Sequence, residues 1–254
     1  MSTDSTRINS YEDDRRPIAP KIVTTTPESE FIQPPPLRAR MLCEMIGTCL
    51  FIFYGAGCAV NSKDLLTVSA AHAMATMWLV YVLGPVSGGH FNAGATIAFA
   101  IDGKMKLIEI FGYLFAQLVG SLVAGVLVLA LYGTGTTLGT PALADGVHVL
   151  HGFAIEFIST TVLSFVIFFT TSYNSHKEAA LPIGLVVLSS FLIGANRDGA
   201  ALNPWRWFGP AVVSNTFHGH AWIYAVGPIG GFILGYVLFR IYKITWNGGR
   251  YRQV

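Results

Sequence analysis

The chain has 254 residues, of which 52% are hydrophobic and only 12% are charged, and its mean hydropathy is +0.53. A soluble domain normally carries about twice that share of charge. Because charged side chains are costly in hydrocarbon, this composition indicates a membrane protein. The formal net charge of +2, without a basic cluster interleaved with aromatic residues, argues against nucleic-acid binding.

The charged residues are concentrated at the N-terminus, where residues 1–40 hold 12 of the 30 in the chain. This region is polar, mixed in charge and lacks the apolar core of a signal peptide. We therefore predict that residues 1–39 form a disordered cytoplasmic tail. The tail is either inert or regulated by phosphorylation, and the hydroxyl residues beside its prolines are Thr24, Thr25, Thr26 and Ser29.

Six apolar segments are long enough to span a bilayer, which requires about 20 residues. They cover residues 41–60, 66–86, 107–132, 147–171, 179–195 and 221–241. Two further apolar stretches, 87–101 and 203–217, are too short to span. With the N-terminus inside, nine basic residues near the spans fall on the inner side and two on the outer side, which is the usual cytoplasmic bias.

The sequence also contains an internal repeat. A glutamate in a span, an asparagine in a short stretch and a glycine in the next span recur in the same order. The successive spacings are 48 and 28 residues for Glu44, Asn92 and Gly120, and 47 and 28 residues for Glu156, Asn203 and Gly231. Each half contains three spans, so the two halves must be inserted with opposite orientation.

This repeat predicts an all-α membrane protein with six transmembrane helices and two re-entrant half-helices in an inverted repeat. A half-length helix is tolerated in the bilayer only when other helices bury it, so the two should meet N-terminus to N-terminus at the midplane. The predicted channel domain covers residues 40–244, with repeats of about 40–133 and 147–244. Residues 245–254 are the predicted cytoplasmic C-terminal tail.

Asn92 and Asn203 are well suited to the start of the half-helices. Asparagine is a good N-cap, and its amide NH2 group can point into a lumen as a donor. Two facing helix N-termini make the midplane positive, which repels cations and orients a passing water molecule. The simpler alternative is helix capping in a tight bundle without a pore.

The two short stretches carry a specific resemblance. The first reads Ser-Gly-Gly-His-Phe-Asn-Ala-Gly-Ala-Thr over residues 87–96, and the second reads Asn-Pro-Trp-Arg-Trp-Phe-Gly-Pro over residues 203–210. Together with their spacing, they resemble the paired Asn-Pro-Ala motifs of the aquaporin (major intrinsic protein) family over about residues 41–244. The resemblance implies an aquaporin-like fold, a homotetramer and one pore in each subunit.

The motifs depart from the family pattern at their second and third positions. The first has Ala93 and Gly94 in place of Pro and Ala, and the second keeps Pro204 but has Trp205 in place of Ala. We expect Gly94 and Trp205 to be a matched pair, in which the missing methyl group makes room for the indole. The indole would pack behind the motif or intrude into the lumen.

The resemblance also implies an outer constriction. Its four positions are His72, Phe191, Ala200 and Arg206, of which Arg206 would donate to water and exclude cations. His72 could equally be a buried core residue, and Phe191 could be ordinary packing. If both line the pore, the opening is narrow and suits water better than glycerol.

Glu44 and Glu156 are the acids expected inside spans. The resemblance implies that each supports the re-entrant loop of its own half, which we favour over a role in proton coupling. Cys43, Cys49 and Cys58 lie in one apolar segment and do not suggest a disulfide framework. No catalytic motif or metal-ligand spacing is present, so neither an enzyme nor a cofactor is expected.

We therefore expect a passive channel for water that excludes ions and protons, placed in the plasma membrane with both termini in the cytoplasm. Two alternatives remain. One is a channel for another small neutral solute, such as ammonia, hydrogen peroxide or a small polyol. The other is a junction or scaffold protein with a closed pore on the same fold, which the bulky Trp205 makes worth considering.

Overall fold

The structure of the protein is a computed structural model that describes residues 35–246. This part of the chain contains eight helices and no strand. In chain order they are α1 (Leu37–Asn61), α2 (Leu65–Ser87), α3 (Ala93–Ile101), α4 (Leu107–Tyr132), α5 (Val149–Tyr173), α6 (His176–Asp198), α7 (Pro204–Ser214) and α8 (Ile223–Thr245). The expectations for the N-terminal tail, including its threonines, and for most of the C-terminal tail lie outside the described residues.

The first helix begins slightly before the expected domain boundary, at Leu37 rather than at residue 40. The physical reason is the proline run that ends at Pro36. Proline has no backbone N–H and a fixed φ, so it cannot continue a helix backwards but is well placed just before one. The helix therefore starts directly after the run.

Six of the helices, α1, α2, α4, α5, α6 and α8, are long and apolar enough to cross a membrane. They coincide with the six predicted spans to within a few residues. Many large apolar side chains on them are exposed, including Phe111 and Phe115 on α4 and Ile193 on α6. Such a surface is unfavourable in water and suits hydrocarbon, which confirms the fold predicted from the repeat.

The recurring glycines are explained by close packing of helices. Within the first half α4 packs on α1, and within the second half α8 packs on α5. A Cβ atom at Gly120 would lie 2.2 Å from the carbonyl oxygen of Met45, and one at Gly231 would lie 2.4 Å from that of Phe157. Any larger residue would separate the paired helices.

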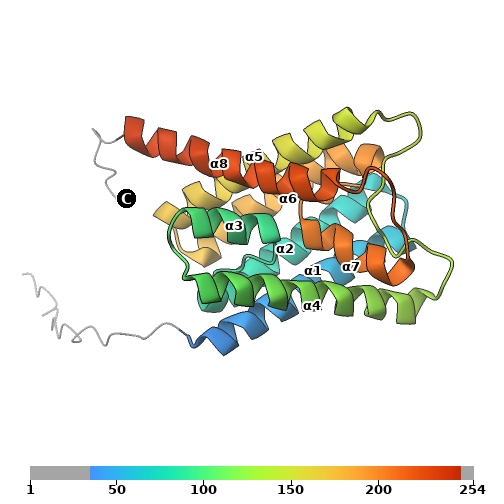
Figure 1. Cartoon of the computed structure of the whole chain (residues 1–254), viewed down its shortest axis with the longest axis horizontal. Coiled ribbons are helices and arrows are strands. Elements are labelled where there is room, and N and C mark those ends of the chain that lie inside the picture. The colour runs from blue at the N-terminus through green and yellow to red at the C-terminus, as the bar shows by residue number, and fades with distance from the viewer. Residues whose placement is uncertain (1–34, 247–254) are drawn as a thin grey trace, which may run out of the picture. The chain divides into compact units, whose positions relative to one another are not determined.

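The two short stretches form the half-helices α3 and α7. Figure 1 shows them between the long helices α4 and α8, with α3 toward one end of the bundle and α7 toward the other. They are in contact with each other, and both also pack on α4 and α8. We refer to the two ends of the bundle as the α3 end and the α7 end.

Candidate functional site

Each half-helix begins at the asparagine of its motif. The side-chain oxygen of Asn92 accepts a hydrogen bond from the backbone N–H of Gly94 at 2.9 Å, and that of Asn203 accepts one from Trp205 at 3.0 Å. Both asparagines have extended backbone angles and are buried. They are therefore ordinary N-caps in geometry, with the oxygen committed to the helix and the NH2 group left for another partner.

That other partner comes from the opposite half. The Asn92 Nδ2 group donates to the carbonyl oxygen of Leu202 at 2.8 Å, and the Asn203 Nδ2 group donates to that of Phe91 at 2.7 Å. Each amide nitrogen carries two hydrogens, so one remains for the lumen. Phe91 and Leu202 precede the two caps, and both have left-handed φ angles, +45° and +54°. This conformation is unusual for such residues and needs support from its surroundings.

The buried glutamates supply that support. Glu44 accepts hydrogen bonds from the N–H groups of His90 and Phe91 at 3.0 and 2.7 Å. Glu156 accepts bonds from those of Ala201 and Leu202 at 2.6 and 2.7 Å. Both glutamates have no exposed surface. Each carboxylate thus holds the loop of its own half, in the arrangement that the resemblance implied.

A third buried acid, Asp198, was missed by sequence reasoning. It ends α6 and has no exposed surface, and its Oδ1 accepts a hydrogen bond from the N–H of Ala200 at 2.9 Å. Its Oδ2 atom has no hydrogen-bond partner among the described residues. The repeat could have identified it, because Asp198 stands five residues before Asn203, as Ser87 stands five residues before Asn92. Ser87 likewise accepts a bond from Gly89, at 3.2 Å.

Trp205 lies behind the motif and is absent from the lining of the central cavity. Its indole N–H donates to the side-chain oxygen of Gln117 on α4 at 3.2 Å. The Gln117 amide nitrogen donates in turn to Glu44 at 2.8 Å and to the hydroxyl of Thr96 at 2.9 Å. Gln117 therefore connects the atypical tryptophan of the second half to the loop-supporting glutamate of the first.

The expected pairing of Gly94 with Trp205 is wrong in this structure. A Cβ atom at Gly94 would lie 2.5 Å from the Phe232 ring of α8, which is the nearest side chain. The space left by the missing methyl group therefore accommodates Phe232. Trp205 instead occupies space between α7 and α4, where its indole N–H finds a side-chain acceptor.

Three of the four constriction residues, His72, Phe191 and Arg206, are in contact with one another through the imidazole of His72. The Arg206 Nε atom donates to Nε2 of His72 at 3.1 Å, and its NH1 group donates to the carbonyl oxygen of Gly139 at 2.6 Å. The ring of Phe191 stacks on that of His72 with centroids 4.0 Å apart. His72, Phe191 and Ala200 have no exposed surface, and Arg206 is 2% exposed. Arg206 pairs with a neutral ring and a carbonyl group, not with an acid.

Gly139 reaches Arg206 because it is a glycine. Its φ angle is +69°, and a Cβ atom there would lie 2.6 Å from the carbonyl oxygen of Ala56 on α1. A side chain would therefore be strained and would also push the loop away from α1. The loop between α4 and α5 thus lies close enough for its backbone carbonyl to hold the guanidinium group.

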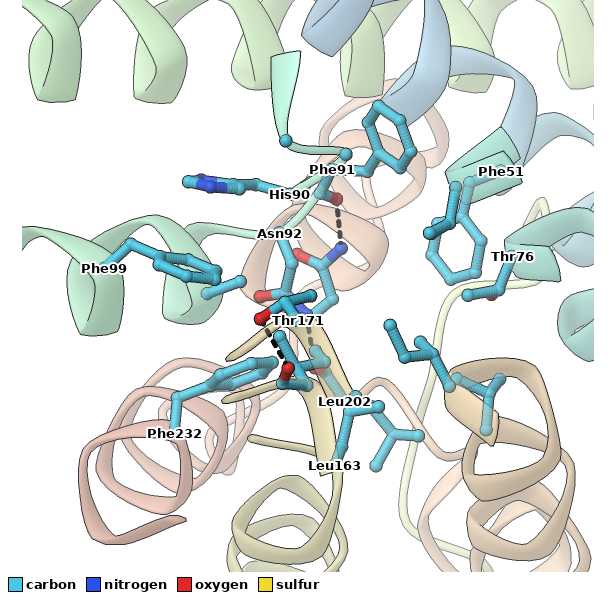
Figure 2. Close-up of a pocket in the computed structure, with 18 of the residues that line it drawn as sticks. Phe51, Thr76, His90, Phe91, Asn92, Phe99, Leu163, Thr171, Leu202 and Phe232 are labelled. Carbon is cyan, nitrogen blue, oxygen red and sulfur yellow. Dashed lines mark hydrogen bonds between the residues drawn. The ribbon is translucent and has the colours of Figure 1, made fainter. Parts of the chain in front are cut away.

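Three cavities follow the axis of the bundle. The vestibule, of about 530 Å³, opens at the α7 end and is lined by residues that include Val68, Gly139 and Arg206. The central cavity, of about 60 Å³, is lined by residues that include Asn92, Asn203 and Phe232. Figure 2 shows Asn92 and Leu202 at its centre, with Phe51 and Thr76 to one side and Phe99 and Phe232 to the other. The far mouth, of about 250 Å³, lies at the α3 end.

The central cavity and the far mouth lie side by side, and both are lined by His90, Phe99, Thr171 and His176. At this end, outside the spans, Asp102 forms an ion pair with Lys104 of its own loop at 2.9 Å, and a second pair with Arg240 at 3.4 Å joins the end of α3 to α8. Burial raises the pKa of Asp102, but hydrogen bonds from Lys104, Tyr236 and Arg240 together outweigh burial and leave that pKa below its ordinary value.

Comparisons with known proteins agree with this geometry. The family model described as Major intrinsic protein matches residues 32–239. Aquaporin-5 of Mus musculus is 35% identical over 208 residues, with 78% of each chain covered. Nodulin-26 of Glycine max is 32% identical over 229 residues, which cover 87% of this chain and 84% of the relative.

Among solved structures, the X-ray structure of the aquaglyceroporin from Plasmodium falciparum superposes with a TM-score of 0.73. The match covers 82% of this chain and 96% of that one at 22% identity, which supports the fold. The resemblance drawn from the paired motifs is therefore confirmed. The chain belongs to the major intrinsic protein family and is a multi-pass membrane channel for small solutes.

Proposed function

We propose that the protein conducts water passively and excludes ions and protons. The observation that carries the proposal is the reciprocal pair of asparagine bonds at the central cavity. Asn92 and Asn203 are each fixed through one amide hydrogen to the opposite half. Both also line the cavity. The remaining donor of each therefore has a fixed position from which it can meet a water molecule.

Such a centre favours a single orientation of water. The donors of both asparagines, and the positive ends of α3 and α7, attract the water oxygen. A water molecule held in this way directs its hydrogens away from the centre on both sides, which interrupts a proton wire. Much of the remaining lining is apolar, including Leu163, Ile183 and Val187, and these side chains form no hydrogen bonds with water.

Arg206 supports the exclusion of cations. It lines the vestibule and is paired with His72 and Gly139 and not with an acid. Its charge is thus not neutralised by a salt bridge among the described residues. A cation that approaches from the vestibule meets this charge in a region of low dielectric, where repulsion is strong.

We also propose how the protein is oriented in the membrane and how its subunits assemble. The α3 end carries most of the basic side chains near the spans, such as Arg40, Lys104 and Lys243, and we place it in the cytoplasm with both termini. The plasma membrane is the proposed location. A homotetramer with one pore in each subunit is the proposed assembly, and native mass spectrometry in detergent that showed mainly monomer would contradict it.

The function can be tested with purified protein in liposomes, at neutral and at mildly acidic pH. Stopped-flow shrinkage against sucrose measures water flux, glycerol and urea gradients measure solute flux, and an entrapped pH dye measures proton leak. We expect water flux above that of empty liposomes, little glycerol or urea flux and no proton leak.

Asn203→Asp tests the amide donor of Asn203, because aspartate has nearly the same shape. A carboxylate oxygen can still cap α7, but the donor to Phe91 and to the lumen is lost and a negative charge replaces it. We expect less water flux and a weaker barrier to cations. If neither the wild type nor any variant that widens the path shows water or solute flux at either pH, the channel function is contradicted and the closed-pore scaffold becomes the better hypothesis.

A further inference from the structure

The constriction between the vestibule and the central cavity is closed in this structure. A lumen wide enough for water would leave its lining exposed to a sphere of that size. However, His72, Phe191 and Ala200 have no exposed surface, and Arg206 has 2%. The vestibule and the central cavity also share no lining residue, whereas the central cavity and the far mouth share several.

The contact that closes the constriction is the hydrogen bond between Arg206 and His72. The two nitrogen atoms are 3.1 Å apart, so no water molecule can lie between them. The imidazole cannot easily turn away. It stacks on Phe191 with centroids 4.0 Å apart, and it fills the space beside Gly55 on α1, where a Cβ atom would lie 2.2 Å from the ring. Arg206 is therefore held across the path by a fixed acceptor.

This bond requires a neutral imidazole. The Nδ1 atom of His72 lies 2.9 Å from the carbonyl oxygen of Val68, which can only accept, so Nδ1 carries the proton. The Nε atom of Arg206 can only donate, so Nε2 must offer its lone pair. A proton added to Nε2 would remove the acceptor and place two positive charges face to face.

Arg206 is the charged group that faces His72 among the described residues. The neighbouring helices present the Phe51 ring and Gly55 from α1 and the Phe191 ring from α6. No carboxylate from these elements is in hydrogen-bond contact with the imidazole to compensate a positive charge on it. Protonation of the His72 imidazole would therefore cause electrostatic repulsion between His72 and Arg206.

We propose that His72 and Arg206 form a proton-operated gate, closed while His72 is neutral and opened when His72 is protonated from the vestibule. The proposal rests on the proposed function, because it concerns water flux through the same path. Opening separates the two side chains without removing positive charge, so cations stay excluded while water passes.

The test is osmotic water flux of proteoliposomes with the same pH on both sides, between about pH 7.5 and pH 4, because burial of His72 and the facing charge of Arg206 both oppose its protonation. Flux of the wild type should increase as pH falls, by up to about tenfold per pH unit while the pH remains above the pKa of the gate. His72→Phe keeps a ring against Phe191 and Gly55 but has no acceptor and no titration. Its flux should be higher than that of the wild type at neutral pH and should not change with pH.

His151→Ala is the control, because His151 is exposed at the start of α5, outside the path, and its variant should keep the pH response of the wild type. His72→Ala gives a second variant in case His72→Phe does not fold, which thermal unfolding would reveal. Wild-type flux that does not change with pH overturns the gate, as does an unchanged pH response in the His72 variants. In both cases the channel function would stand. Absence of flux from the wild type and both His72 variants at every pH would overturn the channel function and the gate together.

Discussion

Asp198 occupies in the second half the place that Ser87 occupies in the first. Ser87 accepts from the N–H of Gly89 and donates to Glu44 at 2.7 Å, whereas Asp198 accepts from the N–H of Ala200 and leaves its other oxygen without a partner among the described residues. The loop before α7 thus depends on two buried carboxyl groups, from Asp198 and Glu156. The loop before α3 depends on one carboxyl group and a hydroxyl group.

This difference predicts an order of stability among variants at residue 198. Asp198→Ser should keep the acceptor for Ala200, remove a second buried acid beside Glu156 and reproduce the arrangement of the first half. Asp198→Ala should leave the Ala200 N–H unsatisfied, which costs about 1–3 kcal/mol. Thermal unfolding in detergent should therefore show a higher midpoint for Asp198→Ser than for Asp198→Ala. An alanine variant as stable as the serine variant would contradict the capping role of Asp198.

The bond between Trp205 and Gln117 predicts a specific effect of Trp205→Phe. The variant keeps an aromatic ring but leaves the buried oxygen of Gln117 without its donor, so we expect a loss of about 1–3 kcal/mol in the free energy of unfolding. Water flux should change little, because Trp205 does not line the central cavity.

Trp207→Phe is the matched control for that prediction. Trp207 is buried whereas Trp205 is half-buried, and the indole N–H of Trp207 has no partner among the described residues. Both substitutions remove the same atoms, so the difference between their unfolding midpoints isolates the bond to Gln117. Equal destabilisation by the two would mean that this bond contributes nothing.

The contact between Gly94 and Phe232 predicts that Gly94→Ala overpacks the centre of the bundle. We expect a destabilisation of about 1–3 kcal/mol, because the added methyl group would overlap the ring. When Phe232→Leu is combined with Gly94→Ala, it should recover much of the lost stability. Trp205→Ala combined with Gly94→Ala should not. A double-mutant cycle by thermal unfolding measures both couplings. Additive effects of Gly94→Ala and Phe232→Leu would show that the two sites are independent.

The position of the cysteines predicts low sensitivity of water flux to mercuric chloride. Cys43, Cys49 and Cys58 are all on α1, and none lines the vestibule or the central cavity. Ala200→Cys should create a reversible block, because a thiol there would stand in the constriction. Osmotic flux with and without mercury, followed by a reducing agent, measures this. Strong block of a variant that lacks all three native cysteines would contradict the prediction.

The sequence alone determined the architecture of this protein. Charge-free segments of sufficient length define the six spans because hydrocarbon excludes charge, and the recurring Glu, Asn and Gly landmarks define the inverted repeat. Asn92 and Asn203 were identifiable as caps because the physics of a helix N-terminus is local. The loop-supporting role of Glu44 and Glu156 came from the resemblance to the family, and the repeat places them 48 and 47 residues before Asn92 and Asn203.

Only the tertiary structure decided which side chains are neighbours across the bundle. The space at Gly94 accommodates Phe232 from α8, and the indole of Trp205 finds Gln117 on α4, 88 residues away along the chain. His72 and Arg206, which are 134 residues apart, share a hydrogen bond because α2 and α7 both pack on α1. Such contacts depend on how helices of distant sequence position pack and on the rotamers that fill the remaining space. Periodicity and spacing along one chain carry no information about either.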